Sequence, residues 1–134
     1  MTGVFEVGTT VEFEAFHLMP DAEGPEGNLH SHRYRVEIVA ARTGLDDRGM
    51  VVDLDVLTEA VRRVAQGLAA KDLQEVVRPS FEAGVTVEIL AGWLHERLSA
   101  ALTPTFSDRI AIRVWESSDS FGGYAGPPGA PPFT

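Results

Sequence analysis

The 134-residue sequence contains no cysteine, which excludes a disulfide framework and a thiol nucleophile. This absence fits a reducing compartment, and we expect a cytoplasmic location. Lysine is nearly absent too, because Lys71 is the only lysine among the 11 basic residues, and the formal net charge is −9. Binding to nucleic-acid phosphates needs a basic surface, so this balance disfavours nucleic acid as a partner.

Long apolar runs are also missing. None approaches the length of a membrane-spanning helix, and the first residues do not follow the pattern of a secretory signal peptide, so we expect no membrane partner. What is present is an ordinary globular composition, with 44% hydrophobic and 23% charged residues. A chain of this length can form one domain with a hydrophobic core. We expect that domain to span residues 1–124, followed by a glycine- and proline-rich tail over residues 125–134.

Alternating apolar and polar residues predict the strands of a sheet. These strands cover residues 4–17, 30–42, 109–116 and, as a short last strand, about 121–124. Helical spacing predicts one helix after Asp53 and a second from about Thr86, and both residues are suitable N-caps. Pro79 and Gly84 fall in the connector between the helices. The order β-β-α-α-β(-β) predicts an α+β fold, in which two helices pack on one face of an antiparallel sheet.

Two histidines begin the core-facing side of the second predicted strand. In the segment NLHSHRYRVEIVA (residues 28–40), His30 and His32 share a face with Tyr34 and with the apolar residues that follow it. His17 ends the preceding strand, and consecutive strands usually pair antiparallel. Pairing would bring all three histidines to one end and one face of the sheet. Residues two apart in a strand lie about 6–7 Å apart, so their imidazoles can reach one metal ion.

Three histidines at one point form the ligand set of a catalytic zinc site, because they leave the fourth position open for water or substrate. The alternative is that His30 and His32 are partly buried histidines with ordinary hydrogen bonds. A bare His-x-His favours that alternative, but the placement of His17 favours the metal.

Glu116 is a second polar residue on a predicted core face, where it continues the series Ile110, Ile112 and Val114. A buried carboxylate is costly unless it is paired. Glu116 is therefore either a fixed acceptor for adjacent N–H donors of a ligand, or a strand-end residue that reaches solvent.

Five segments together resemble the 6-pyruvoyl-tetrahydropterin synthase and 6-carboxy-tetrahydropterin synthase family. They are FEAFH (13–17), HSHRYRVE (30–37), GMVVDLDVL (49–57), TVEILAGWL (86–94) and VWESSDSFGGY (114–124), and they occur in this order. The resemblance implies the tunnelling fold, in which subunits assemble around a barrel with active sites between them. It therefore implies a homo-oligomer, a trimer or a hexamer, that acts on a small pterin-like molecule.

The resemblance also implies roles for particular residues. His17, His30 and His32 match the ligands of a zinc ion. Glu116 matches the glutamate that anchors the pterin ring. Thr86 and Glu88 match a Thr-x-Glu that helps to shape the ring pocket, with a simple helix cap as the alternative for this pair.

The sequence departs from the family at the residues that move protons. The synthases place a cysteine four residues before the His-x-His pair, and this sequence has Glu26 there. A subgroup with glutamate at that position removes the pterin side chain and leaves a hydroxymethyl group. Glu26 is thus the candidate general base, unless it is one more solvated acid in an acidic loop.

The family's Leu-Asp-His after the first helix is replaced by Leu68, Ala69 and Ala70, so both members of its proton-relay pair are missing. Asp72 lies nearby in sequence, and we expect His95 to be a flank or surface histidine rather than a substitute base.

Two functions follow from these observations. The first is a zinc-dependent lyase on a pterin or pterin-like substrate, with Glu26 as the base and Glu116 holding the ring. The second is an inactive or repurposed family member, which binds a pterin-like ligand or acts on a non-pterin substrate in specialised metabolism. The net charge disfavours a triphosphate substrate unless arginines cluster locally, and Arg33 and Arg35 are expected to face away from the zinc.

Overall fold

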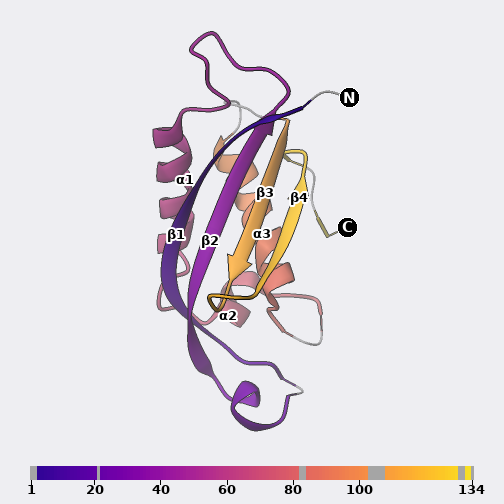
Figure 1. Ribbon diagram of the computed structural model, residues 1–134. Helices are drawn as coiled ribbons and strands as arrows, with labels where there is room; N and C mark the ends of the chain where they lie inside the picture. Colours follow the sequence, from indigo (N-terminus) through magenta and orange to yellow (C-terminus); the bar gives the residue numbers. More distant parts are fainter. Residues whose placement is uncertain (1–2, 21, 82–83, 103–107, 130–131, 134) are drawn as a thin grey trace.

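The computed structural model describes residues 3–20, 22–81, 84–102, 108–129 and 132–133, apart from the side chain of Glu26. Four strands form one antiparallel sheet in the order β1-β2-β3-β4, so each strand lies beside its neighbour in sequence (Figure 1). Their bounds are β1 (Phe5–His17), β2 (His30–Arg42), β3 (Arg109–Trp115) and β4 (Phe121–Gly126). The predicted α+β fold with an antiparallel sheet is confirmed.

The helices lie behind the sheet in Figure 1 and cover one of its faces. They are α1 (Leu54–Gln66), α2 (Leu73–Val77) and α3 (Val87–Leu102), and a single 3-10 turn, η1 (Gly24–Gly27), lies in the β1–β2 loop. The short helix α2 was not predicted, because five residues are too few to show helical periodicity. Within the described ranges, none of the helices combines the length and the hydrophobicity that crossing a lipid bilayer requires.

Side-chain hydrogen bonds define where the helices start. The Asp53 carboxylate accepts a hydrogen bond from the Asp55 amide at 2.8 Å, and the Thr86 hydroxyl accepts one from the Ile89 amide at 3.2 Å. Such caps satisfy amides that have no partner within the helix. Both predicted N-caps are therefore confirmed.

The hydrophobic core lies between the helices and the face of the sheet that they cover. Side chains on β2 alternate along the strand, with every second one buried against the helices. The largest contributors include Tyr34, Ile38, Ile110 and Ile112 from the sheet and Leu57, Leu90, Leu94 and Leu98 from the helices. Each fully buried side chain of this size contributes about 1.5–3 kcal/mol to folding.

Helix α3 is buried on more sides than the sequence pattern indicates. His95 has no exposed surface, its ring packs against Tyr124 with centroids 4.8 Å apart, and its Nε2 lies 3.1 Å from the carbonyl oxygen of Gly126. The expectation of a surface histidine was therefore wrong. The reason is that β4 packs on the side of α3 that carries His95, while Phe133 of the tail packs at Gly92.

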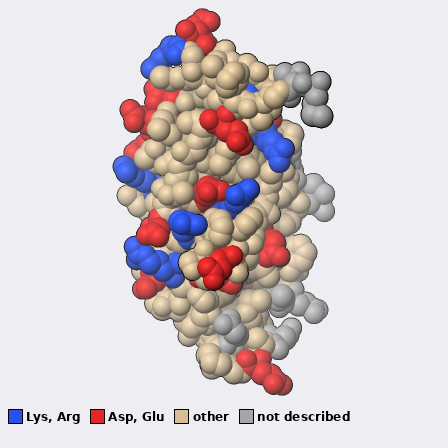
Figure 2. All heavy atoms as spheres, in the orientation of Figure 1, with Lys and Arg blue, Asp and Glu red and all other residues tan. Residues whose placement is uncertain are grey.

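The uncovered face of the sheet carries charged side chains of both signs, which lie side by side in Figure 2. Arg33 pairs with Glu12 at 3.4 Å, and the guanidinium of Arg35 stacks 4.7 Å above the ring of Trp115. The exposed pair of Arg33 and Glu12 contributes at most about 1 kcal/mol. Arg33 and Arg35 thus face away from the helices, as predicted.

Candidate metal centre

The strand register brings the three histidines together at one end of the sheet. His17 pairs directly with His30, and His32 lies two residues further along the same face of β2. Pairing of β2 with β3 stops at Arg35 and Trp115, so the end of the β1–β2 hairpin extends beyond β3 (Figure 1). One side-chain nitrogen of each histidine lies within 4.8 Å of those of the other two. We call these three residues the histidine triad, and their predicted convergence is confirmed.

The three rings surround a single point. Their centroids are 4.6 Å apart for His17 and His30, 4.8 Å for His17 and His32, and 4.7 Å for His30 and His32. Tyr34 supports two of the rings from the core side, with its centroid 6.2 Å from that of His17 and 5.8 Å from that of His32. Only 1% of the Tyr34 surface is exposed, so these rings rest on a packed support.

Backbone carbonyls select the nitrogen that two of the rings can offer to a metal. Nδ1 of His17 lies 3.4 Å from the carbonyl oxygen of Val85, and Nδ1 of His30 lies 2.7 Å from that of Asn28. A carbonyl oxygen only accepts, so both Nδ1 atoms carry the hydrogen and Nε2 is left as the ligand nitrogen.

The triad fits a metal ion. Nε2 of His17 is buried and has no hydrogen-bond partner among the described residues. Buried polar atoms normally have a partner, and a cation held by the triad would be one. The Nε2 atoms of His30 and His32 lie 3.1 Å apart. Two nitrogens bound at about 2.0–2.1 Å to one tetrahedral zinc ion are separated by about 3.3 Å, which is close to the observed distance.

Burial lowers the pKa of His17 below its usual value of 6.5, because the charged imidazolium loses its hydration. The hydrogen bond to Val85 and the negative charge of Glu116 oppose this effect, while His32 and His30 reinforce it. The net lowering keeps His17 neutral at pH 7, which is the form that binds metals.

Glu116 follows directly after β3, and its side chain is exposed. The strand-end alternative therefore describes its position in the single chain. The reason is that the strand ends one residue earlier, at Trp115. Its charge nevertheless raises the pKa of His17, so the carboxylate acts on the triad.

The first turn of α3 lies against β4 because of a glycine. A Cβ atom on Gly122 would lie 2.5 Å from Cγ2 of Val87 and 3.0 Å from the amide nitrogen of Glu88, so no other residue fits without a shift. Thr86 caps this helix and is half-buried, and Glu88 is exposed. Thr86 directly follows Val85, whose carbonyl contacts His17.

The segment that replaces the proton-relay pair runs beside the end of β1. The Ala70 amide donates to the carbonyl of Glu14 at 2.7 Å, and the Phe16 amide donates to that of Lys71 at 2.8 Å. Alanine side chains transfer no proton, so positions 69 and 70 supply neither a base nor an acid next to the triad. The nearby Asp72 carboxylate accepts from the Gln74 amide at 3.0 Å and caps α2.

Glu26, the candidate base, belongs to η1, in the loop that leads from His17 to His30. Its side chain lies outside the described residues. One contributor to the site, Val85, was not predicted at all. Val85 acts through its backbone carbonyl, which every residue type carries, so its identity gives no signal in the sequence.

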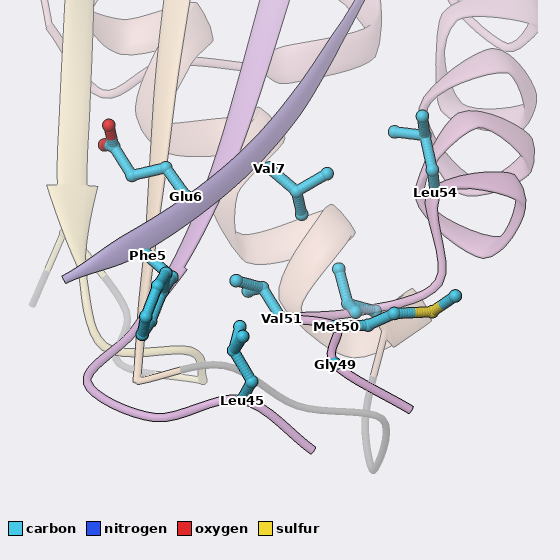
Figure 3. Close-up of a pocket in the computed structure, with 9 residues that line it drawn as sticks. Phe5, Glu6, Val7, Leu45, Gly49, Met50, Val51 and Leu54 are labelled. Carbon is cyan, nitrogen blue, oxygen red and sulfur yellow. The ribbon is translucent and has the colours of Figure 1, made fainter. Parts of the chain in front are cut away.

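A hollow lies at the opposite end of β1 from the triad. Its volume is about 320 Å³, and it is lined mainly by apolar side chains, among them Phe5, Leu45, Met50 and Leu54 (Figure 3). Glu6 is the only titratable residue in the lining. This hollow is therefore separate from the metal centre and lacks its chemistry.

Comparisons with known proteins agree with the geometry. The family model described as 6-pyruvoyl tetrahydropterin synthase matches residues 6–127. The chain therefore belongs to the 6-pyruvoyl tetrahydropterin synthase family. A 6-carboxy-5,6,7,8-tetrahydropterin synthase from Bacillus subtilis (strain 168) is 26% identical over 112 residues, which are 83% of this chain and 77% of the relative.

Solved structures share the fold. The 6-pyruvoyl tetrahydropterin synthase of Caenorhabditis elegans has a TM-score of 0.75 at 19% identity, over 93% of this chain and 97% of that one. A 6-pyruvoyltetrahydropterin synthase from Plasmodium vivax has a TM-score of 0.74 at 14% identity, over 93% of this chain and 99% of that one. The latter is a variant in which a glutamate, described as a catalytic residue, is replaced by alanine.

Proposed function

We propose that the protein is a cytoplasmic, zinc-dependent lyase that acts on a pterin or pterin-like small molecule. The observation that carries this proposal is the histidine triad, in which Nε2 of His17 is buried without a hydrogen-bond partner among the described residues. Family membership supports the reaction class, and the tetrahydropterin synthases among the relatives support the pterin. The triad would hold the ion through its Nε2 atoms.

Zinc, when bound, lowers the pKa of a coordinated hydroxyl group or water. The protein's own groups do the rest. The carbonyls of Val85 and Asn28 hold two ligand rings in the productive tautomer. Glu26, on the loop before His30, would act as the general base that removes a proton from the substrate side chain. The catalytic glutamate of the Plasmodium vivax relative supports a glutamate in this role.

Recognition of the ring falls to the carboxylates near the triad. Glu116 would accept two adjacent N–H donors of a pterin-like ring, which a carboxylate can engage in a bidentate manner. Thr86 uses one lone pair in its cap, and its hydroxyl hydrogen remains available for a ligand. Glu88, two residues after Thr86 on the first turn of α3, would help to line the same pocket.

The site is completed by further copies of the chain, and we propose a homo-oligomer, a trimer or a hexamer, with active sites between subunits. Among the described strands, β1 and β4 each pair on one side only. Unpaired strand edges favour pairing with another chain. Assembly would also cover Glu116 and Glu88, which are exposed in the single chain.

One observation favours a second function. Ala69 and Ala70 lie beside the end of β1 and provide no proton relay, so a chain that binds a pterin-like ligand without turning it over is consistent with the same site. Such a protein, or one that acts on a non-pterin substrate, would keep the triad and Glu116 but would not need the relay.

Two measurements on the purified protein separate these functions. Zinc-loaded protein is assayed for turnover of dihydroneopterin-type substrates, and untreated protein is denatured to look for a released fluorescent pterin. Turnover supports the lyase. A released pterin without turnover supports the binding function. If neither turnover nor a released pterin is observed, a non-pterin substrate is the remaining possibility.

A further inference from the structure

The backbone of residues 84–86 connects the metal centre to the helix that carries Thr86 and Glu88. Val85 is 2% exposed, and its carbonyl oxygen lies 3.4 Å from Nδ1 of His17. The Thr86 hydroxyl accepts from the Ile89 amide at 3.2 Å, which attaches the same segment to α3. Residue 86 is thus fixed by the helix, and the position of the Val85 carbonyl also depends on how residue 84 is held.

Gly84 is that residue, and it is packed from three directions. A Cβ atom on Gly84 would lie 3.0 Å from Cδ of Pro20, 3.1 Å from the carbonyl oxygen of Leu18 and 3.2 Å from Oε1 of Gln74. Its φ is +84°, a conformation that favours glycine. Leu18 directly follows His17. Gly84 therefore packs against the backbone next to His17 and is also bonded to Val85, whose carbonyl contacts the His17 ring.

We propose that Gly84 is a positioning residue for the metal, because it places the Val85 carbonyl that holds His17 in the Nδ1–H tautomer with Nε2 aimed at His30 and His32. This inference rests on the proposed zinc site and concerns how that site is built. A side chain at position 84 would displace either the Val85 carbonyl or the Leu18 backbone. Either movement turns the His17 ring away from the point that the other two rings share.

The test compares two glycines with nearly the same φ angle. Gly84→Ala introduces a methyl group into the packed site, whereas Gly49→Ala introduces one at φ +78° with nothing within 4 Å. The two variants carry the same kind of backbone strain, so only the first changes contacts beside His17. Zinc affinity of each is measured by competition with a chromophoric chelator, and cobalt substitution reports the geometry of the site.

Loss of an outer partner of a metal ligand typically weakens binding about 10–100-fold. We expect this loss in Gly84→Ala, together with an altered cobalt spectrum, and wild-type affinity in Gly49→Ala. Equal affinities in Gly84→Ala and the wild type would overturn the inference and leave the zinc site standing. A wild type that binds no zinc would instead remove the proposed function itself.

A second measurement does not depend on how the variant folds. Nitrogen NMR of the histidine rings in the metal-free wild type distinguishes Nδ1–H from Nε2–H for His17. The inference requires the hydrogen on Nδ1, and a hydrogen on Nε2 overturns it even if Gly84→Ala fails to fold. In a folded Gly84→Ala, the His17 signals should show a mixture of both tautomers, which a general loss of stability would not produce.

Discussion

Each histidine of the triad offers one ligand nitrogen, and two imidazoles hold zinc poorly, so losing one residue should empty the site. We expect about one zinc per chain in the wild type and almost none in His30→Ala, measured by elemental analysis of protein never exposed to a chelator. Asn28→Ala is the matched control, because His30 uses the backbone carbonyl of that residue and not its side chain. Zinc loss in the control, or zinc retention in His30→Ala, would contradict the site.

The two glutamates of the β1–β2 loop provide a second comparison. If Glu26 is the general base, Glu26→Gln should lower turnover about 10²–10⁴-fold, while Glu23→Gln should have little effect. Both variants are assayed on dihydroneopterin-type substrates after their zinc contents have been matched. An active Glu26→Gln would exclude Glu26 as the base and would make Asp72 the next candidate for that role.

The pKa of His17 predicts how the metal-free protein responds to acid. Its pKa is lowered in the folded state, so an unfolded chain takes up a proton near pH 6.5 before the folded one does. This contribution to stability is therefore complete above pH 6.5 and is lost as the pH falls toward the lowered value. Urea unfolding between pH 7.5 and pH 5 should show a smaller loss of stability in His17→Gln than in the wild type. The same pH slope in both proteins would show that His17 does not contribute.

Glu116 allows the sign of one electrostatic effect to be checked. Its negative charge raises the pKa of His17, so Glu116→Gln should lower that pKa further. An NMR titration of the metal-free protein measures the shift directly, with Glu12→Gln, on the uncovered face of the sheet, as the control. An unchanged or raised pKa in Glu116→Gln would place the carboxylate out of reach of the triad.

The residues with side-chain chemistry could largely be placed from the sequence. Alternation along the strands puts His17, His30 and His32 on one face, and antiparallel pairing puts them at one end, so local rules were sufficient. Gly84 and Val85 could not be found in this way. Their contribution depends on a contact between segments 68 residues apart, and a backbone carbonyl has no sequence signature.

At the scale of elements, α3 shows where periodicity stops being informative. An amphipathic pattern reports a helix with one buried face, whereas α3 contacts β3, β4 and α1 and is also covered at Gly92 by the tail. The buried position of His95 follows from these long-range contacts. By contrast, α1 has one buried stripe, formed by Leu57, Val61 and Ala65, and the sequence predicted its start correctly.

The contact between Gly92 and the tail can be tested by combining substitutions at Gly92 and Phe133. A glycine inside a helix normally costs about 0.5–1 kcal/mol relative to alanine. Here a Cβ atom would lie 2.8 Å from Cζ of Phe133, so Gly92→Ala should bring little or no gain in the wild type. In a Phe133→Ala background the full gain should appear, as measured by urea unfolding. An equal effect of Gly92→Ala in both backgrounds would show that the tail contact contributes no energy.

At the scale of the whole molecule, the sheet has two outer edges and an apolar end. Val4 and Phe5, at the start of β1, are 58% and 51% exposed. We expect light scattering at micromolar concentration to give a multiple of the 14.5 kDa chain mass. Phe5→Glu, at the strand edge, should weaken assembly more than Val56→Glu on α1, where a similar apolar side chain is 40% exposed. A monomeric wild type would leave the proposed inter-subunit sites incomplete.

The end of the β1–β2 hairpin has a consequence for how the sequence of this protein can evolve. His17 and His30 are the two residues from which the loop of residues 18–29 departs, so an ion on the triad would fasten both ends of that loop at once. Doubling the length of a closed loop costs only about 0.6 kcal/mol. The loop can therefore gain, lose or exchange residues, Glu26 among them, while its anchor points stay in register. New chemistry at this site could arise by rewriting the loop alone, with the sheet and the metal ligands inherited intact.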